Sequence, residues 1–379
     1  MYSYWQRKAF GRCDTVIIGA GITGLSTAIS LRAREPHREI VVLERGIFPT
    51  GASVRNAGFA CIGSLTEIKD DLAAMGEAKT LELLALRWRG LRLLRERLGE
   101  ERIGYRENGS YELLDRQSAS CLDDLDRVNA LLLPVLSAEA YSVMSPQSGR
   151  FGLDPERAHI LLRNHLEGEL DTGLMMSALL RLARDLGIVV QTGCEVIRLA
   201  EDNQGVTLEM AERNSQEPFR LRAVRAGVCT NGYVASLLPE LAVTPGRGQV
   251  VLTEPVPDLK IRGIFHFDRG YYYFREIEGR VLFGGGRQLD AKTETTTEEG
   301  PNSLILNDLA DKLKHIILPG VSFKIAQQWS GIMAFGPEKS PLVLRVTPHI
   351  YAGVRMGGMG IAIGSAVGEQ LAALMSEQQ

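Results

Sequence analysis

The sequence predicts an α/β fold, with a Rossmann-like dinucleotide-binding domain and a second, mainly antiparallel β-sheet domain that also carries helices. A strand, a glycine-rich turn, a helix and a second strand succeed one another within residues 14–44. Strand-like segments at 250–253, 271–275 and 280–283 follow each other without helices between them, which indicates antiparallel pairing. The chain has 379 residues, 45% of them hydrophobic, and is long enough for two domains with substantial cores.

The glycines of the first segment have a spacing with a physical purpose. Residues 15–18 form a β-branched run, which is typical of a buried parallel strand. The run enters the sequence G-A-G-I-T-G, in which Gly19 permits a tight turn and Gly21 lets the backbone approach a pyrophosphate. Gly24 lets the following helix pack closely against the strand. This spacing predicts a phosphate-binding turn between strand and helix.

The helix and the second strand complete the predicted dinucleotide site. Residues 25–33 read as a helix, and the N–H groups at its start, near Ile22 and Thr23, attract a pyrophosphate through their partial positive charge. Residues 39–44 read as a second strand that ends in Glu44. An acid at this distance from the turn can bind the ribose hydroxyls of an adenosine. We therefore expect the chain to bind a dinucleotide through its ADP half.

The composition argues against several function classes. A net charge of −3 provides no bulk attraction for nucleic acid or an anionic membrane. The five cysteines are scattered without C-x-x-C, which is typical of a reducing compartment, and the six histidines lack metal-ligand spacing. Residues 1–13 lack the apolar core of a signal peptide. We expect a cytoplasmic protein with no metal site and no transmembrane segment.

The segment after Glu44 carries a second pattern of small and polar residues. Arg45 follows the acid directly, and residues 51–58 read G-A-S-V-R-N-A-G, which lets a backbone lie against a flat or anionic ligand. Together with the three spaced glycines, these residues resemble the FAD-dependent amine and amino-acid oxidases, the family of D-amino-acid oxidase, glycine oxidase and monomeric sarcosine oxidase. The resemblance covers nearly the whole chain and implies FAD as the cofactor. We expect non-covalent binding, because the C-terminal strand contains no cysteine or histidine.

The resemblance also implies which residues contact FAD. Val196 matches a position whose backbone meets the adenine, residues 226–233 match a strand that closes against the pyrophosphate, and residues 351–362 match a glycine-rich strand beside the isoalloxazine ring. The residues expected to bind the cofactor are Gly19, Gly21, Ile22, Thr23, Gly24, Glu44, Arg45, Ala52, Ser53, Arg55, Asn56, Ala57, Gly58, Val196, Thr230, Asn231, Gly232, Gly331, Arg355, Gly357, Gly358, Met359, Gly360 and Ile361.

The resemblance further implies that the FAD-binding domain is discontinuous. Residues 1–100, 165–235 and 330–379 are expected to form it. Residues 101–164 and 236–329 are expected to form the substrate domain. We then expect the active site at the junction of the two domains.

The implied activity is oxidation of a C–N bond in a small amine or amino acid. In the family, a neutral amine passes its α-hydrogen to the flavin as hydride, the imine hydrolyses, and dioxygen takes the electrons to give hydrogen peroxide. Sarcosine oxidases carry a lysine near the flavin for the reaction with oxygen, whereas residues 281–283 here are apolar. Two alternatives stay open: a dehydrogenase of the same fold that passes electrons to a quinone or carrier protein, and a flavin-binding subunit of a hetero-oligomer.

Three residues are candidates for contact with the substrate. Glycine oxidase-like enzymes carry a carboxylate-binding arginine shortly after a Trp–Gly pair, and Met333 occupies about that place here. Arg355, in a strand of small and apolar residues, is the first replacement, with a structural ion pair as its alternative role. Arg287, after three glycines, is the second. Tyr272 is the third, because strand alternation points it away from its two tyrosine neighbours, although core packing is its alternative role.

One long helix is also predicted. Residues 69–98 have leucines at helical spacing, with weak interruptions at Gly76 and Gly90. A solvated face is expected for its arginines, which are Arg87, Arg89, Arg92, Arg95 and Arg97.

Overall fold

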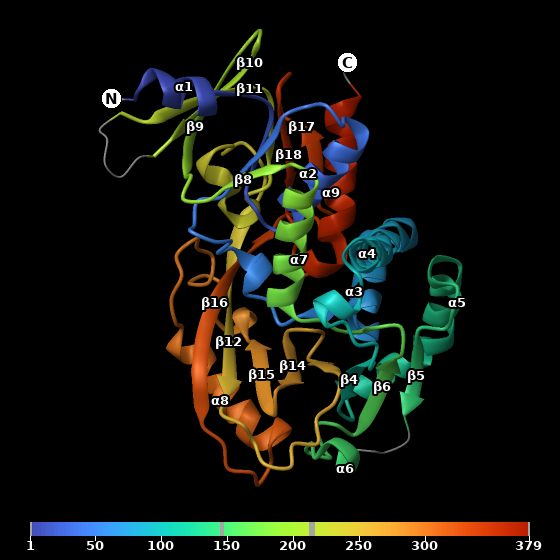
Figure 1. Cartoon of the computed structure of the whole chain (residues 1–379). Coiled ribbons are helices and arrows are strands. Elements are labelled where there is room, and N and C mark those ends of the chain that lie inside the picture. The colour runs from blue at the N-terminus through green and yellow to red at the C-terminus, as the bar shows by residue number, and fades with distance from the viewer. Residues whose placement is uncertain (1, 145–147, 212–216, 378–379) are drawn as a thin grey trace.

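Two eight-stranded sheets form the framework of the chain, the first in the upper half of Figure 1 and the second in the lower half. The computed structural model describes residues 2–144, 148–211 and 217–377. A short antiparallel ladder pairs β3 (Phe59–Ala60) with β7 (Gly168–Glu169). The predicted α/β fold, with one largely parallel and one largely antiparallel sheet, is confirmed.

The first sheet is mainly parallel. Its strands run in the order β17-β18-β11-β1-β2-β8, and only β17 joins this row in the antiparallel direction. An antiparallel ribbon of β9 and β10 extends from β11. The strands are β1 (Arg12–Ile18), β2 (Ile40–Leu43), β8 (Val189–Gln191), β9 (Val196–Asp202), β10 (Gly205–Met210), β11 (Phe219–Val228), β17 (Leu342–Arg345) and β18 (Ile350–Val354).

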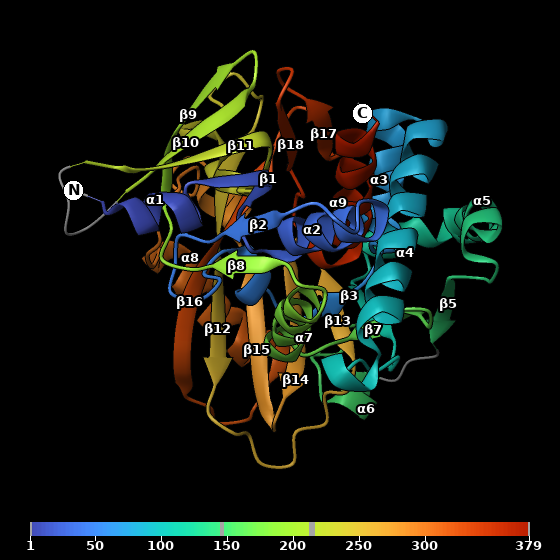
Figure 2. The ribbon, with the colours of Figure 1, turned by 45° about the horizontal axis from the view of Figure 1, so that its top comes forward.

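Helices cover one face of the first sheet (Figure 2). α2 contacts both α7 and α9, and α4 contacts α9. Ile17 of β1, Leu25 of α2 and Leu371 of α9 belong to one apolar core, whereas Val16 and Ile18 of β1 point into a second core on the opposite face. The helices are α1 (Tyr4–Phe10), α2 (Ile22–Arg34), α3 (Leu65–Met75), α4 (Glu77–Leu98), α7 (Thr172–Asp185) and α9 (Gly360–Ser376).

The second sheet is antiparallel except for the pair β13–β4. Its order is β16-β12-β15-β14-β13-β4-β6-β5. The strands are β4 (Ser110–Leu114), β5 (Tyr141–Met144), β6 (Ile160–Asn164), β12 (Thr244–Thr253), β13 (Ile264–Phe267), β14 (Tyr272–Ile277), β15 (Arg280–Gly285) and β16 (Ile325–Phe335). The helices of this half are α5 (Leu125–Leu136), α6 (Ser148–Phe151), α8 (Ser303–Lys312) and a π-helical turn at Leu313–Ile317.

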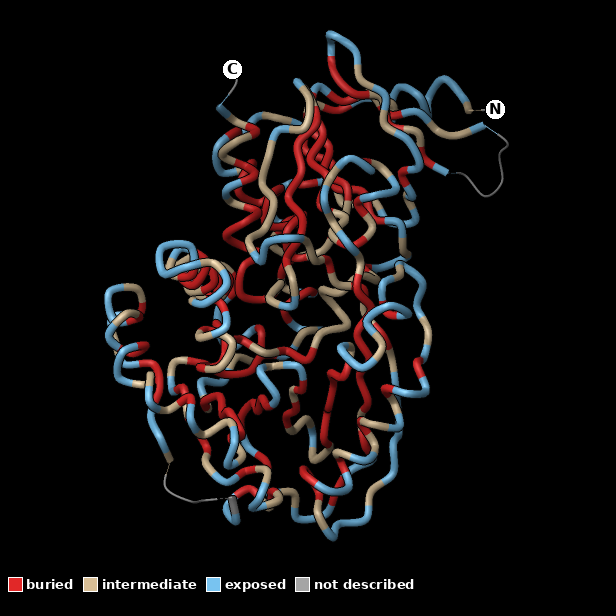
Figure 3. The backbone as a smooth tube through the Cα atoms, turned by 180° about the vertical axis from the view of Figure 1, so that it is seen from behind, coloured by how far each residue is buried: buried red, intermediate tan, exposed pale blue. Residues whose placement is uncertain are grey.

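The two faces of the second sheet have different neighbours. Phe265, Tyr272 and Phe283 pack with Ile305 of α8 in an apolar core beneath the sheet. Side chains that alternate with these, such as Tyr273, point to the opposite face. Figure 3 shows buried segments running through both halves of the molecule, with the exposed segments mostly at the periphery.

Two expectations about the predicted long helix are corrected by the structure. The helix predicted at 69–98 is two helices, α3 and α4, separated at Gly76. Arg87 of α4 is buried and forms an ion pair with Asp71, so it does not belong to a solvated face.

The distribution of strands supports the division into two domains that we propose. The first sheet takes its strands from residues 12–43, 189–228 and 342–354, and the second from residues 110–164 and 244–335. Because β16 pairs with β12, we propose that the boundary expected at residue 330 lies instead at the end of β16.

Candidate active site

A cavity of about 620 Å³ lies between the two sheets. The first sheet contributes residues at the carboxyl ends of its strands, including Ile18, Leu43 and Cys229. The second sheet contributes residues of β12, β13, β14 and β16, including Tyr273 and Met333. Ligands of open, largely parallel sheets bind at the carboxyl ends of the strands, so the cavity lies where the topology predicts a ligand site.

The glycine turn forms one wall of the cavity. Gly19 has a φ of +104°, and a Cβ there would lie 2.8 Å from the Cys229 carbonyl oxygen, so the β1–α2 turn requires glycine. Gly21 begins α2, and the Ile22 N–H donates to Ser53 Oγ at 3.0 Å. A Cβ at Gly21 would approach the same oxygen to 2.8 Å. Gly21 is therefore required for the close contact between the start of α2 and Ser53 of the loop at 51–58.

Glu44 lies at the end of β2, on the cavity wall. Its carboxylate accepts the Ala20 N–H at 3.1 Å and the Gly46 N–H at 3.0 Å, which fixes its orientation beside the glycine turn. Nearby on the wall, the Arg45 guanidinium lies 3.9 Å from the centre of the Tyr233 ring. A carboxylate and a cation–aromatic pair beside a phosphate turn suit an adenosine.

Asn231 ties the end of β11 to the C-terminal glycine loop. Its Oδ1 accepts the Arg355 N–H at 3.1 Å and the Met356 N–H at 3.2 Å. The neighbouring Thr230 Oγ1 is buried and has no hydrogen-bond partner among the described residues, although Thr230 lies on the cavity wall. A buried hydroxyl without a partner is costly unless a ligand supplies one.

Most residues expected to bind the cofactor lie on the cavity wall. These are Gly19, Gly21, Ile22, Thr23, Glu44, Arg45, Ala52, Ser53, Arg55, Asn56, Ala57, Val196, Thr230, Asn231, Gly331, Arg355, Gly357, Gly358, Met359, Gly360 and Ile361. The exceptions are Gly24, Gly58 and Gly232, where a Cβ would collide with the carbonyl oxygens of Gly19, Leu170 and Met333 respectively. These three glycines therefore have a packing role, and their contact with the cofactor stays a prediction.

Arg55 has protein partners of its own. Its guanidinium forms an ion pair with Glu299 at 2.9 Å and donates to the Thr50 and Ser330 carbonyl oxygens. Arg55 therefore links the loop at 51–58 to β16 and to the segment before α8.

Arg355, the first candidate for a substrate carboxylate, lies on the cavity wall and is 6% exposed. Its Nε donates to the Ser340 carbonyl oxygen at 2.8 Å, and its backbone has a φ of +69°. Burial lowers the pKa of this guanidinium, although the charge of Glu338 acts in the opposite direction. No carboxylate of the described ranges forms an ion pair with it, so the structural ion pair weighed as its alternative role is not present.

Arg287, the second candidate, also lies on the cavity wall, just after β15. Its guanidinium carbon is 4.3 Å from the centre of the Phe335 ring. Within the described part of the chain, this guanidinium has no hydrogen-bond or ion-pair partner. It is therefore an uncommitted cation held against an aromatic ring, which is a suitable receptor for a carboxylate.

Tyr272, the third candidate, does not fit the cavity. As expected from strand alternation, Tyr272 points away from Tyr271 and Tyr273. However, Tyr271 and Tyr273 line the cavity, and Tyr272 does not. The Tyr272 hydroxyl donates to Asp308 at 2.7 Å beneath the sheet. Burial raises the pKa of Tyr273 to about 12, and its hydroxyl has no hydrogen-bond partner among the described residues. The expectation for Tyr272 is corrected in favour of Tyr273.

Sequence reasoning missed Glu67 and His266, which both lie on the cavity wall. His266 belongs to β13, and the strand pairings place it between Glu112 of β4 and Tyr273 of β14. Residues 264–267 read I-F-H-F, and this β-branched and aromatic run is a signal that could have indicated the strand. Glu67 lies in the first turn of α3, a position that reads as an ordinary helix cap.

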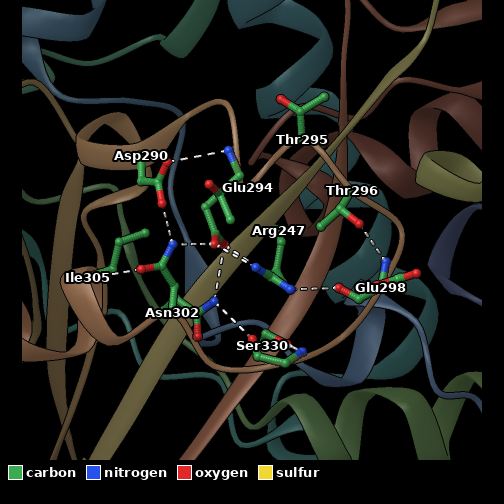
Figure 4. A network of polar contacts seen from close by, with 12 residues as sticks. Arg247, Asp290, Glu294, Thr295, Thr296, Glu298, Asn302, Ile305 and Ser330 are labelled. Carbon is green, nitrogen blue, oxygen red and sulfur yellow. Dashed lines mark hydrogen bonds and ion pairs between the residues drawn. The ribbon is translucent and has the colours of Figure 1, made fainter.

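A buried polar network holds the segment that carries Arg287 (Figure 4). Glu294 is fully buried and accepts from Arg247 at 2.8 Å and 3.0 Å, from Gln249 at 3.1 Å and from Asn302 at 2.8 Å. Arg247 and Gln249 belong to β12, and Asn302 caps α8. The network therefore fixes residues 287–302 against the sheet next to the cavity.

The chain resembles proteins of known family over almost its whole length. The model of the FAD dependent oxidoreductase family matches residues 14–374. The chain belongs to this family. It is 25% identical to gamma-glutamylputrescine oxidoreductase of Escherichia coli (strain K12), over 96% of this chain and 83% of that protein. Its fold is similar to glycine oxidase of Geobacillus kaustophilus and to L-proline dehydrogenase of P. horikoshii. The glycine oxidase has a TM-score of 0.76 at 20% identity, with 97% of this chain and 96% of that chain covered. The L-proline dehydrogenase has a TM-score of 0.77 at 18% identity, with 97% of this chain and 94% of that chain covered.

The residues of the cavity fit FAD, the cofactor of the family. Gly21, the N-cap of α2, lies on the cavity wall, and a helix N-terminus is where a pyrophosphate binds best. Glu44 is placed for ribose hydroxyls, and Thr230 has a buried hydroxyl that lacks a partner. The assignment of each single residue to FAD stays a prediction.

The described ranges contain neither a metal-binding cluster nor a membrane-spanning helix. No group of three or more histidine, cysteine, aspartate or glutamate side chains is arranged there to hold a metal ion. None of the described helices combines the length and apolar character needed to span a bilayer.

Proposed function

We propose that the protein oxidises a C–N bond of a small amine or amino acid, with non-covalently bound FAD and with dioxygen as the electron acceptor. The family and the Escherichia coli relative, which is named for an amine substrate, support this proposal. The observation that carries it is Arg287, whose guanidinium reaches the cavity without a protein partner among the described residues. A substrate carboxylate is the anion that such a cation is suited to bind.

Arg287 is now a stronger candidate than Arg355 for the carboxylate. Arg355 donates its Nε to Ser340, so only part of its guanidinium is available to a ligand. Phe335 beneath Arg287 restricts the orientation of the guanidinium, which reduces the entropy lost when a carboxylate binds. A charge-assisted bond of this kind contributes roughly 1.5–3 kcal/mol.

Aromatic and apolar side chains form the rest of the substrate end. Phe59 packs edge-on against Tyr273, with ring centres 5.6 Å apart, and Met333 and Phe335 also line the cavity. These side chains exclude water around the substrate and strengthen the polar contacts made there. The neutral Tyr273 hydroxyl can donate a hydrogen bond to the substrate. FAD, when bound, supplies the two-electron oxidation.

Anaerobic bleaching of the flavin tests the proposal. The holoenzyme is mixed under nitrogen with a library of amino acids and polyamines, and loss of the yellow absorbance band is recorded. We expect bleaching by at least one amine or amino acid. If none bleaches the flavin while dithionite does, the proposed function is wrong.

Oxygen consumption with the bleaching substrate then separates the acceptors. An oxidase reoxidises its flavin with dioxygen and produces hydrogen peroxide in equal amount to the substrate consumed. Val281, Leu282 and Phe283 on β15 are apolar where sarcosine oxidases carry a lysine, so a dehydrogenase stays open as the alternative to an oxidase. Flavin that stays bleached in air but is reoxidised by a quinone would support that alternative.

A further inference from the structure

The cavity has a second polar end, formed by Glu67 and His266. His266 is 6% exposed, and its ring packs edge-on against Phe59 with centres 5.1 Å apart. Neither of its ring nitrogens has a hydrogen-bond partner among the described residues. Burial lowers the pKa of His266, with the charge of Glu67 opposing this effect, so the imidazole is neutral near pH 7. A neutral imidazole offers one acceptor nitrogen and one donor.

Glu67 places a carboxylate at the same end. One of its oxygens accepts the Ser64 N–H at 3.0 Å and completes the capping box of α3. No cation of the described chain lies within 4.0 Å of this carboxylate. The hairpin before β14 closes over it, because a Cβ at Gly270 would lie 2.7 Å from the carboxyl carbon.

The other charged groups around Glu67 are already paired. Arg87 lies 3.9 Å from Asp71 and donates to the Ile62 carbonyl oxygen, and Lys339 also binds Asp71. Arg269 pairs with Asp70 at 3.7 Å, and Glu338 with Lys79 at 3.6 Å. On this part of the cavity wall, Glu67 is therefore the charged group among those named that has no ion-pair partner and can bind a ligand.

The two polar ends are far apart along the second sheet. His266 is on β13, whereas the Arg287 guanidinium lies over β12, because a Cβ at Gly246 would be 3.4 Å from its Nη1. Three strand steps separate β13 from β12, and neighbouring strands are about 4.8 Å apart. A ligand that contacts both ends must therefore be extended.

We infer that the Glu67–His266 end binds a nitrogen group with N–H donors, an ammonium or an amide, at the distal end of an extended substrate. This inference rests on the proposed function and adds the chemistry of the substrate tail. Glu67 accepts a charge-assisted bond from an ammonium, and the acceptor nitrogen of His266 accepts a second bond from either group. Arg287 and Glu67 together select a substrate with opposite charges at its two ends.

Binding of lysine, glutamine and norleucine to the dithionite-reduced holoenzyme under nitrogen tests the inference, because reduced flavin cannot oxidise these probes. These probes carry a distal ammonium, a distal amide and an apolar end. Dissociation constants are obtained from the rise in Tm with ligand concentration. We expect lysine to bind at least tenfold more tightly than norleucine, with glutamine between them.

The Glu67→Gln variant removes the charge and keeps the helix cap, because glutamine also serves in a capping box. It is expected to lose about tenfold in lysine affinity, which is about 1.4 kcal/mol, while norleucine affinity stays within threefold. His266→Phe keeps the aromatic contact and is expected to weaken lysine and glutamine equally. The matched control is Asp70→Asn, which changes another carboxylate of the cavity wall that is paired with Arg269. It should retain the lysine preference.

Two outcomes overturn the inference: the absence of a lysine preference in the unsubstituted protein, or an equal loss of that preference in Glu67→Gln and Asp70→Asn. Failure of the proposed function is a separate result. Bleaching by amines without a lysine preference overturns only this inference, whereas a lysine preference without bleaching by any amine overturns only the proposed function.

Discussion

At the scale of single residues, Arg287 is the proposed binding partner of the substrate carboxylate. Replacing it by methionine keeps much of the packing on Phe335 and removes the charge. We expect Arg287→Met to raise KM for a carboxylate substrate by about ten- to a hundredfold, because a charge-assisted bond is lost and each 1.4 kcal/mol is tenfold. FAD content should not change. Steady-state kinetics with an amino acid and with the matching decarboxylated amine measure the effect.

The comparison with Arg355→Met makes this test specific. If Arg355 binds the substrate carboxylate instead, Arg355→Met raises KM for the amino acid more than Arg287→Met does. In that case Arg287→Met leaves this KM almost unchanged. If Arg287→Met raises KM equally for the amino acid and for the decarboxylated amine, a role of Arg287 in carboxylate binding is contradicted.

Two buried carboxyl groups predict the pH dependence of stability. Burial raises the pKa of Glu112 and that of Glu167 to about 7. Each group holds its proton in the folded state between its ordinary pKa and pH 7, whereas the unfolded chain releases it. The free energy of unfolding therefore falls as pH rises through this window, by about 1.4 kcal/mol per pH unit for each group.

The Glu112→Gln variant isolates one of these groups. Glutamine stays neutral and can keep the hydrogen bond from Thr66. Between pH 5 and pH 8 the variant should lose about 2–3 kcal/mol less stability than the unsubstituted protein. Urea unfolding at both pH values measures this difference. Identical pH profiles for the two proteins would show that Glu112 does not change its charge in this range.

At the scale of elements, Glu294 holds residues 287–302 to β12 through Arg247 and Gln249. Glu294→Gln leaves the buried Arg247 without its counter-charge and should lower the free energy of unfolding by about 3–5 kcal/mol. KM should rise as well, because the segment carries Arg287. The urea midpoint and KM are measured together.

Glu299→Gln is the control for this element. It removes the partner of Arg55 from a side chain that is 41% exposed, so its cost should be below about 1 kcal/mol. A loss of stability in Glu294→Gln as small as in Glu299→Gln would contradict the role given to the buried network.

The elements also show what sequence reasoning can reach. The turn after β1 was predictable because its glycine spacing and the position of Glu44 are local features of one β–α–β segment. The substrate end was not, because it depends on β13 pairing with β4, whose residues are more than a hundred positions away. Alternation put Tyr272 and Tyr273 on opposite faces, but it did not indicate which face meets the cavity.

At the scale of the whole molecule, FAD is expected to connect the two halves of the chain. A ligand that binds only the folded state raises stability with its concentration, so the holoenzyme should have a higher Tm than the apoprotein. Acid precipitation should leave the flavin in the supernatant as intact FAD. Flavin that pellets with the chain would contradict non-covalent binding.

A crystal structure of the protein with FAD and a carboxylate inhibitor tests the central claim most directly. The claim is that one cavity between the two sheets holds the cofactor against the glycine turn and the substrate against the second sheet. We predict the pyrophosphate at the start of α2 and the inhibitor carboxylate within about 3 Å of the Arg287 guanidinium, beside Tyr273. An inhibitor carboxylate bound away from Arg287, or FAD bound away from the glycine turn, would contradict it.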